Sequence, residues 1–259
     1  MDYLAGNVQL VIAIFGVKVD AFQAALYGKK YEHLQLIHEL GHTVQKYGGK
    51  AFRNAITDKN YEVLDFFIRN GVDINYNKPD SVYPFKPTPL CVAARYVDLQ
   101  MCKYLVEHGA DVTIIEKDGM RPYSIAIEKG DMEMVEYFKS LEPTEFHDIQ
   151  NKMDQLKPFK LPKALVSFLE RDTLYFELPD TDFISIEFLP LLDTIPFKVG
   201  RRKLLRLSKE LGEYNDWQIV WDTKSKKIAC YDTEHQELRE LCKFDEFIAD
   251  MSSQLETLF

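Results

Sequence analysis

Several features that would assign this chain to a specialised class are scarce or missing. It has 4 cysteines in 259 residues, and no two of them have C-x-x-C spacing, so the sequence indicates neither a disulfide framework nor a cysteine zinc site. The longest nearly uncharged apolar run, residues 8–17, is about half as long as a bilayer-spanning helix. No basic residue precedes that run, as a secretory leader would require. These absences predict a cytoplasmic protein with reduced cysteines and no membrane partner.

Basic residues are too few for a typical nucleic-acid-binding protein. The formal net charge is -9 at pH 7, and the dense basic cluster is confined to residues 201–209. Because neutralising phosphates requires a basic surface, we expect no nucleic-acid partner. An acidic protein attracts cationic molecules, which favours a basic protein partner. A solvated acidic surface without such a role is the alternative.

What the sequence does contain is an internal repeat. A phenylalanine, tyrosine or leucine stands three residues before each of four alanines, and an apolar residue stands twelve after; the alanines are Ala25, Ala55, Ala93 and Ala126. These offsets place apolar groups on one face of each of two short helices, with a break between the helices. Sixteen residues after the first three alanines stand Gly41, Gly71 and Gly109, where a helix must end and glycine enters the left-handed region without penalty. The fourth repeat has Glu142-Pro143 instead, which predicts a terminal repeat.

The third repeat carries the most specific motifs. Thr88-Pro89-Leu90-Cys91-Val92-Ala93 and Gly109-Ala110-Asp111 resemble the T-P-L-H-x-A start and the G-A-D turn of ankyrin repeats, with Cys91 in place of the family histidine. The resemblance implies that residues 1–142 form about four repeats in an all-α solenoid. Each repeat would be a helix, a turn, a helix and a projecting loop, here called a finger, and the stack would bind protein on its concave side.

One finger is longer than the others. Ala55 and Ala93 are 38 residues apart instead of 33, so five extra residues enlarge the finger between residues 76 and 87. Prolines stiffen this loop, and exposed aromatic residues on a rigid loop are frequent interface anchors. We expect a partner protein to contact this finger and the helix after it, through Tyr76, Tyr83, Phe85, Lys86 and Tyr96, and we expect truncation of Tyr83 and Phe85 to leave folding almost unchanged.

A possible catalytic motif lies in the first repeat. His38-Glu39-Leu40-Gly41-His42 matches H-E-x-x-H, in which two histidines on one helical face bind zinc and the glutamate acts as general base. However, Gly41 occupies the position that ends the second helix of the repeat, so His42 would lie beyond the helix. A metalloprotease also needs a third zinc ligand, and no second histidine motif supplies one. The repeat register therefore argues against a zinc enzyme.

After residue 142 the period disappears. We expect residues 143–157, as a polar stretch or a short helix, to connect the repeats to an α+β domain at residues 158–259 with a central antiparallel sheet. Trp217 to Trp221 and Lys227 to Tyr231 flank a polar turn and predict a hairpin, with both tryptophans in the core and Asp222 and Asp232 forming turns. The remaining elements expected are a helix at 163–171, strands at 174–178, 183–188 and 203–207, and a closing helix at 245–258.

Three segments of this second region carry a further resemblance. Leu161-Pro162-Lys163 with Phe168-Leu169, the hairpin around Trp217-Gln218-Ile219-Val220-Trp221, and Lys243-Phe244-Asp245-Glu246-Phe247 are similar to the SUKH superfamily. That family includes fungal cell-wall regulators and bacterial immunity proteins against toxins, and it acts by binding. One departure is the glycine-rich stretch before the hairpin, reduced here to Gly212-Glu213-Tyr214-Asn215.

Together these features predict a binding protein and not an enzyme, with no cofactor, no metal and no small-molecule substrate. The combination of ankyrin and SUKH resemblances implies an immunity protein that neutralises a toxin by direct binding, and the acidic charge favours a basic toxin as the partner. A regulatory scaffold without a toxin partner is the alternative among binding proteins, and a zinc metalloprotease using His38, Glu39 and His42 is the alternative among enzymes.

Overall fold

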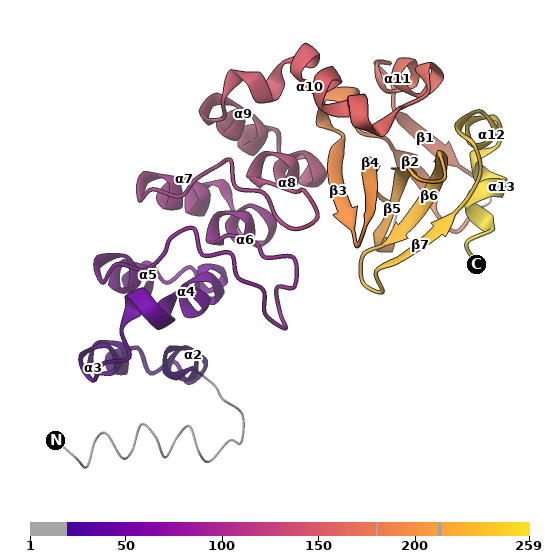
Figure 1. Cartoon of the computed structure of the whole chain (residues 1–259). Helices are drawn as coiled ribbons and strands as arrows, with labels where there is room; N and C mark the ends of the chain where they lie inside the picture. Colours follow the sequence, from indigo (N-terminus) through magenta and orange to yellow (C-terminus); the bar gives the residue numbers. More distant parts are fainter. Residues whose placement is uncertain (1–19, 180, 212–213) are drawn as a thin grey trace. The chain divides into compact units, whose positions relative to one another are not determined.

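A computed structural model describes residues 20–179, 181–211 and 214–259 (Figure 1). The chain divides into two compact units, of which the second comprises Lys117–Met120 and Lys139–Phe259. The apolar run at residues 8–17 and the pair Gly212-Glu213 lie outside the described residues. Among the helices of the described part, none has both the length and the apolar character that crossing a membrane requires.

The first unit is built from pairs of short antiparallel helices, as the repeat predicts. Successive pairs stack through their first helices, so that α2 packs on α4, α4 on α6, and α6 on α8. The pairs are α2 (Ala21–Tyr27) with α3 (Leu34–Glu39), α4 (Val44–Ala55) with α5 (Tyr61–Arg69), α6 (Pro89–Tyr96) with α7 (Leu99–Glu107), and α8 (Pro122–Lys129) with α9 (Met132–Leu141).

The ends of the second helices confirm the predicted glycine positions. Gly41, Gly71 and Gly109 have φ values of 95°, 75° and 97°, in the left-handed region. The amide after each glycine donates a hydrogen bond to the carbonyl five residues earlier, from His42 to Ile37, Val72 to Phe67 and Ala110 to Leu105, at 3.0 to 3.2 Å. This geometry satisfies carbonyls that a helix end leaves free. The same cap therefore closes three successive repeats.

The fourth helix pair ends differently. Pro143 stops the chain from continuing as a helix, and Glu142, buried at this point, forms an ion pair of 2.9 Å with His147. The following segment, 143–157, for which the sequence predicts a connecting stretch or a short helix, is helical and belongs to the second unit. It forms η3 (Thr144–His147), α10 (Ile149–Leu156) and η4 (Lys157–Phe159). Its buried Lys152 donates a hydrogen bond to the carbonyl of Thr194, which ties α10 to the sheet unit.

The second unit contains a five-stranded antiparallel sheet of order β3-β4-β5-β6-β7. The predicted hairpin is confirmed, with Trp221 paired to Ile228 and Trp217 to Asp232. The strands are β3 (Ile195–Val199), β4 (Arg202–Leu211), β5 (Tyr214–Asp222), β6 (Lys227–Asp232) and β7 (Glu237–Glu240). A separate pair consists of β1 (Tyr175–Leu178) and β2 (Ile184–Glu187).

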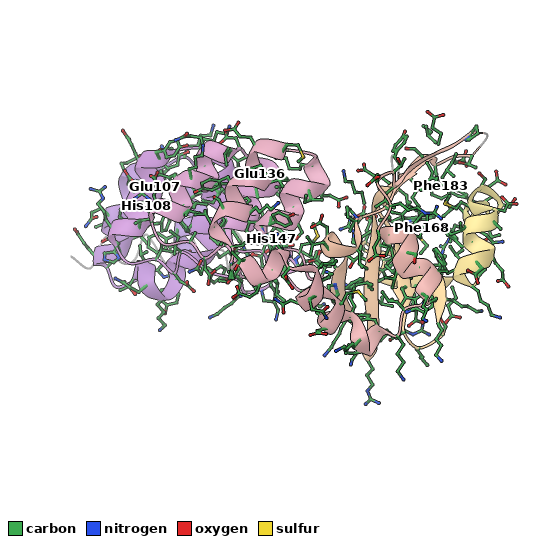
Figure 2. All side chains as sticks on the ribbon, turned by 90° about the horizontal axis from the view of Figure 1, so that it is seen from above. Glu107, His108, Glu136, His147, Phe168 and Phe183 are labelled. Atoms are coloured by element: carbon green, nitrogen blue, oxygen red, sulfur yellow. The ribbon has the colours of Figure 1, made fainter. Side chains whose placement is uncertain are left out.

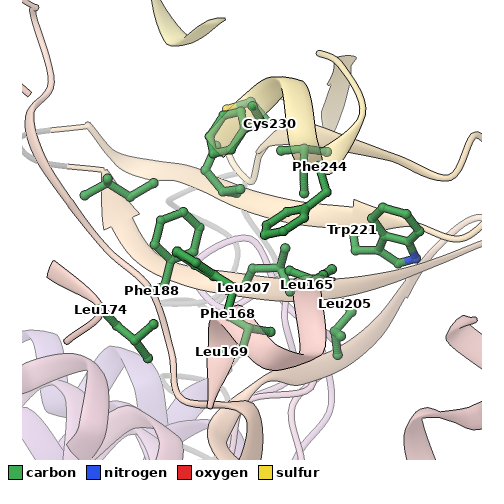
Figure 3. Close-up of a cluster of buried hydrophobic side chains, with 14 of the residues drawn as sticks. Leu165, Phe168, Leu169, Leu174, Phe188, Leu205, Leu207, Trp221, Cys230 and Phe244 are labelled. Atoms are coloured by element: carbon green, nitrogen blue, oxygen red, sulfur yellow. The ribbon is translucent and has the colours of Figure 1, made fainter. Parts of the chain in front are cut away.

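Alternation along the strands gives the sheet two apolar faces. On β5, Ile219 and Trp221 belong to the main core, whereas Val220 belongs to a smaller cluster on the opposite face. Side chains of α11 (Lys163–Leu169), α12 (Phe244–Ala249), α13 (Met251–Glu256), β1 and β2 also belong to the main core. Figure 3 shows Leu165 and Phe168 of α11 and Phe244 of α12 in this cluster. Phe168 of α11 lies among the side chains of this unit (Figure 2), with its ring centroid 5.0 Å from that of Phe188.

Four residues from between the third and fourth helix pairs also belong to the second unit. Gly119 lies so close to the edge strand β3 that a Cβ atom would come 2.6 Å from the carbonyl oxygen of Pro196. Its φ of 86° is likewise a glycine conformation. The edge of the sheet thus contacts residues 117–120, which precede its strands by more than 70 residues in the sequence.

Two features of the second unit differ from the sequence prediction. The strands β3 and β7 were not predicted, and the closing helix at 245–258 is divided into α12 and α13. The division falls at Asp250, whose backbone is non-helical and whose carboxylate accepts a hydrogen bond from the amide of Ser253 at 3.1 Å. An aspartate that caps a following helix in this way ends the preceding one.

The packing of α6 makes a testable prediction. Ala93 has no exposed surface, and α6 contacts both α7 and α8. Ala93→Leu should therefore lower the free energy of unfolding by about 1 to 3 kcal/mol through overpacking. Ala164→Leu, an exposed alanine in α11, is the matched control and should be nearly neutral. Equal denaturant midpoints for wild type and Ala93→Leu would contradict the packing.

Candidate partner-binding surface

The enlarged finger, residues 70–88, is organised by an arginine that comes from the preceding repeat. Arg53 lies near the end of α4 and its side chain is fully buried. Its Nη1 atom donates hydrogen bonds to the carbonyl oxygens of Lys78, at 2.9 Å, and Pro87, at 3.0 Å. Its Nη2 atom forms a 2.5 Å ion pair with the carboxylate of Asp80. One guanidinium thus joins three points of the loop to the helix.

Two tyrosines of the finger complete the surroundings of this cation. The guanidinium carbon lies 5.0 Å from the ring centroid of Tyr76 and 4.8 Å from that of Tyr83, within the range of cation–π attraction. Burial raises the pKa of both phenols. Tyr76 also rests on the backbone of α4, because a Cβ atom at Gly49 would come 2.3 Å from its ring. Both rings are therefore held in place by α4.

Asp80 fixes the tip of the finger. Its Oδ1 atom accepts hydrogen bonds from the amides of Val82, at 2.8 Å, and Tyr83, at 2.9 Å. Burial by itself would raise the pKa of Asp80, but these amides and Arg53 together hold the pKa below its ordinary value. Asp80 is therefore ionised at neutral pH, as a partner of a buried cation must be.

These positions correct part of the sequence prediction. Tyr76, Tyr83 and Phe85 were expected to project as exposed anchors whose truncation leaves folding intact. All three are half-buried, and the two tyrosine rings contact Arg53. Truncation of Tyr83 should thus loosen the finger as well as remove contact area.

The exposed part of the finger surface consists of other side chains. Lys86 is exposed, and its φ of 62° lies in the left-handed region of the backbone. Tyr96, at the end of α6, is 60% exposed, and Val82, at the finger tip, is 58% exposed. Val82 was not predicted, because a single valine among polar residues gives no sequence signal. We call Tyr76, Val82, Tyr83, Phe85, Lys86 and Tyr96 the finger surface.

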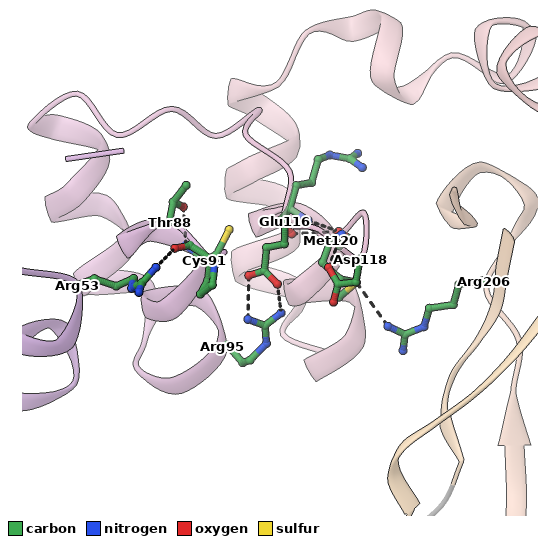
Figure 4. A network of polar contacts seen from close by, with 11 residues as sticks. Arg53, Thr88, Cys91, Arg95, Glu116, Asp118, Met120 and Arg206 are labelled. Carbon is green, nitrogen blue, oxygen red and sulfur yellow. Dashed lines mark hydrogen bonds and ion pairs between the residues drawn. The ribbon is translucent and has the colours of Figure 1, made fainter. Parts of the chain in front are cut away.

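A second arginine holds in place the helix that carries Tyr96, and its role was not predicted from the sequence either. Arg95 forms two parallel hydrogen bonds of 2.9 Å with the carboxylate of Glu116 (Figure 4). Glu116 is buried and lies in the loop after α7. Paired bonds between guanidinium and carboxylate fix orientation as well as distance. The α6 end of the finger surface is thus held by one arginine and the finger by another.

The H-E-x-x-H motif does not form a metal-binding helix face. The helix α3 ends at Glu39, and Gly41 has the left-handed φ of a cap, as the repeat register predicts. The Nε2 atom of His42 lies 2.8 Å from Asp20, and its ring stacks on Tyr47 at 4.1 Å. His38 accepts a hydrogen bond from the amide of Val44. Within the described ranges, no group of three or more histidine, cysteine, aspartate or glutamate side chains has the arrangement of a metal site.

Comparison with known proteins identifies the repeats. Residues 52–148 match the family model described as ankyrin repeats (3 copies). An ankyrin repeat protein of fowlpox virus is 29% identical over 126 residues, 49% of this chain and 20% of that protein. An ankyrin repeat protein of Rickettsia bellii is 32% identical over 87 residues, 33% of this chain and 51% of that protein. The RelA-associated inhibitor of Mus musculus is 38% identical over 91 residues, 34% of this chain and 10% of that protein.

These matches confirm ankyrin repeats in the helical region, and such repeats imply interaction with protein. The chain spans about half or less of the length of the curated relatives that it matches. The family match ends at residue 148. The sheet that follows has the antiparallel strands predicted for it, while its resemblance to the SUKH superfamily stays a prediction.

The finger makes a stability prediction. Arg53→Met should lower the free energy of unfolding by about 3 kcal/mol, because it leaves the Asp80 carboxylate without its buried partner. Arg53→Lys should lower the free energy of unfolding almost as much, since an ammonium group cannot reproduce the planar arrangement of guanidinium donors. Arg69→Met, on an exposed arginine of α5, serves as control and should change stability by less than about 0.5 kcal/mol. Chemical denaturation measures all three, and a neutral Arg53→Met would show that the finger folds without this anchor.

A metal prediction follows from the partners of His38 and His42. The purified chain should contain far less than about one zinc per molecule, because a zinc site needs histidines that share a face and a further ligand. Glu39→Gln should leave partner binding unchanged. Elemental analysis measures the metal directly. Stoichiometric zinc that disappears in His42→Ala would refute the arrangement of the first repeat.

Proposed function

We propose that this chain acts by stoichiometric binding of another protein at the finger surface. The observation that supports this function best is the anchoring of the finger by Arg53, which prefolds a loop that would otherwise be flexible. A preorganised loop loses less conformational entropy on association than a mobile one. The exposed aromatic ring of Tyr96 beside it is the type of residue that dominates interface energies.

The comparisons support a binding role for the repeats. One relative is named as an inhibitor associated with another protein, RelA, which is consistent with regulation through contact. For this chain we propose that it likewise acts by contact with a partner protein, which it occludes or recruits, and that it catalyses no reaction. The proposal includes a cytoplasmic location and no requirement for a cofactor or a small-molecule substrate.

A narrower proposal concerns the second unit. We propose that residues 158–259 form a SUKH domain and that the chain is an immunity protein that neutralises a toxin. The order of helix, antiparallel strands and closing helices supports this proposal, while the family match covers the repeats only. A toxin gene beside this gene would favour immunity over a regulatory scaffold. Protection of cells that express the toxin provides the direct test, and its absence would favour the scaffold.

Binding at the finger surface can be tested with Tyr96→Ala. The ring is 60% exposed, so its truncation should leave the melting temperature nearly unchanged while it weakens partner binding by about 2 kcal/mol or more. The partner is isolated by pull-down with the full chain, and affinities are measured by titration calorimetry. Tyr175→Ala, at a tyrosine of the second unit that is 51% exposed, is the matched control. Loss of affinity in the control instead would place the partner on the second unit.

A further inference from the structure

The charge around the finger surface is opposite to that of the whole chain. Lys46, Lys50 and Arg53 follow one another on α4 at intervals of four and three residues, which places them on one face of the helix. Contacts with the finger show where that face points: Lys50 lies 3.9 Å from Asp80, and Arg53 is enclosed by the loop. A basic stripe therefore runs along α4 toward the finger.

The finger adds two exposed lysines to this stripe. The carbonyl of Lys78 accepts a hydrogen bond from Arg53, and the amide of Lys86 donates one to the carbonyl of Tyr83. Both backbones are thus fixed near the buried cation, while both side chains are exposed. The described residues around the finger place no carboxylate within ion-pair distance of the ammonium group of either lysine.

Few carboxylates lie near the finger surface, and three of them already have a side-chain partner. Asp80 is bound by Arg53, Glu116 by Arg95, and Asp20 by His42. Asp73, at the base of the finger, accepts a hydrogen bond from the amide of Asn75. On α4, the finger and α6, two carboxylates, Asp73 and Asp80, stand against six cations; the cations are Lys46, Lys50, Arg53, Lys78, Lys86 and Arg95. The net charge of -9 therefore lies elsewhere on the chain.

We propose that the segment of the partner that occupies the finger surface is acidic, a stretch of aspartate or glutamate side chains interspersed with apolar ones. This inference rests on the proposed function and specifies its partner. Carboxylates would meet the exposed lysines, whose complementary charge accelerates encounter and fixes register. Apolar side chains would pack on Tyr96 and Val82. A basic partner, which the net charge of the chain favours, is repelled at this face.

The test uses a phage-displayed library of random peptides, selected on the immobilised full chain. Binding of the selected peptides is then measured by fluorescence polarisation with wild type and with Lys78→Glu/Lys86→Glu. The control is Lys224→Glu/Lys226→Glu, because both pairs are exposed and each contains one residue of left-handed φ, 62° at Lys86 and 56° at Lys226. Melting temperatures verify that both variants fold.

The selected peptides should be rich in aspartate and glutamate and should compete with one another. Their affinity should fall about tenfold or more in the finger variant and in raised salt, and should remain unchanged in the control. Peptides that lose affinity with Tyr96→Ala but show no acidic excess would overturn the acidic partner and leave the finger surface as the binding site. The failure of every selected peptide to respond to Tyr96→Ala would overturn both proposals.

A single-stranded RNA oligonucleotide provides the last comparison, since lysines among aromatic rings also suit nucleic acid. We expect no binding of this probe at physiological salt. RNA binding that is lost in Lys78→Glu/Lys86→Glu would overturn the proposal of an acidic protein segment.

Discussion

A cation buried without solvent requires acceptors for its protons, and in this protein that requirement shapes a whole loop. Removing a guanidinium from water is unfavourable unless it is paired and hydrogen-bonded. The two terminal nitrogens of Arg53 meet the condition by binding two carbonyls and one carboxylate of the finger. The other features of the finger follow from this arrangement. The guanidinium carbon lies over the rings of Tyr76 and Tyr83, Gly49 leaves room for the Tyr76 ring, and Asp80 orders the tip through its amide contacts. Ordering a loop of this length costs considerable conformational entropy, and the contacts of Arg53 offset that cost.

The repeats themselves depend on local features, which explains why the sequence predicts them well. The glycine caps and the alanines that let helices approach are short-range signals, and the structure has the three caps where the spacing requires them. The hairpin of β5 and β6 is equally local, because alternation and a polar turn define it. The two strands that escaped prediction, β3 and β7, are the two edges of the sheet. Edge strands are commonly short and contain proline or charge, which limits pairing with other chains. Pro196 and the charged residues of β7 weaken the signal for that reason.

The candidate site was predicted less completely, and the reason is sequence distance. The loop length and its aromatic residues located the finger, but the partners of Arg53 lie 25, 27 and 34 residues away. No periodicity connects an arginine with carbonyls so remote, so the roles of Tyr76 and Tyr83 in holding the finger were not apparent. The same limit applies to Arg95 and Glu116, which are 21 residues apart. The attachment of residues 143–157 to the sheet depends on an equally remote contact, since Lys152 donates its hydrogen bond to the carbonyl of Thr194, 42 residues on.

Two of the three loop acceptors of Arg53 are backbone carbonyls, and this has a consequence for how such a surface can evolve. Every amino acid supplies a carbonyl, so the anchor of the finger constrains the chain path at residues 78 and 87 without constraining which side chains stand there. Asp80 is the member of the three whose identity matters. If the finger surface binds the partner as proposed, substitutions at the exposed positions of the loop would change recognition while the fold of the repeats and the path of the loop persist. Substitutions of Tyr76 and Tyr83, which contact Arg53, would change both recognition and stability.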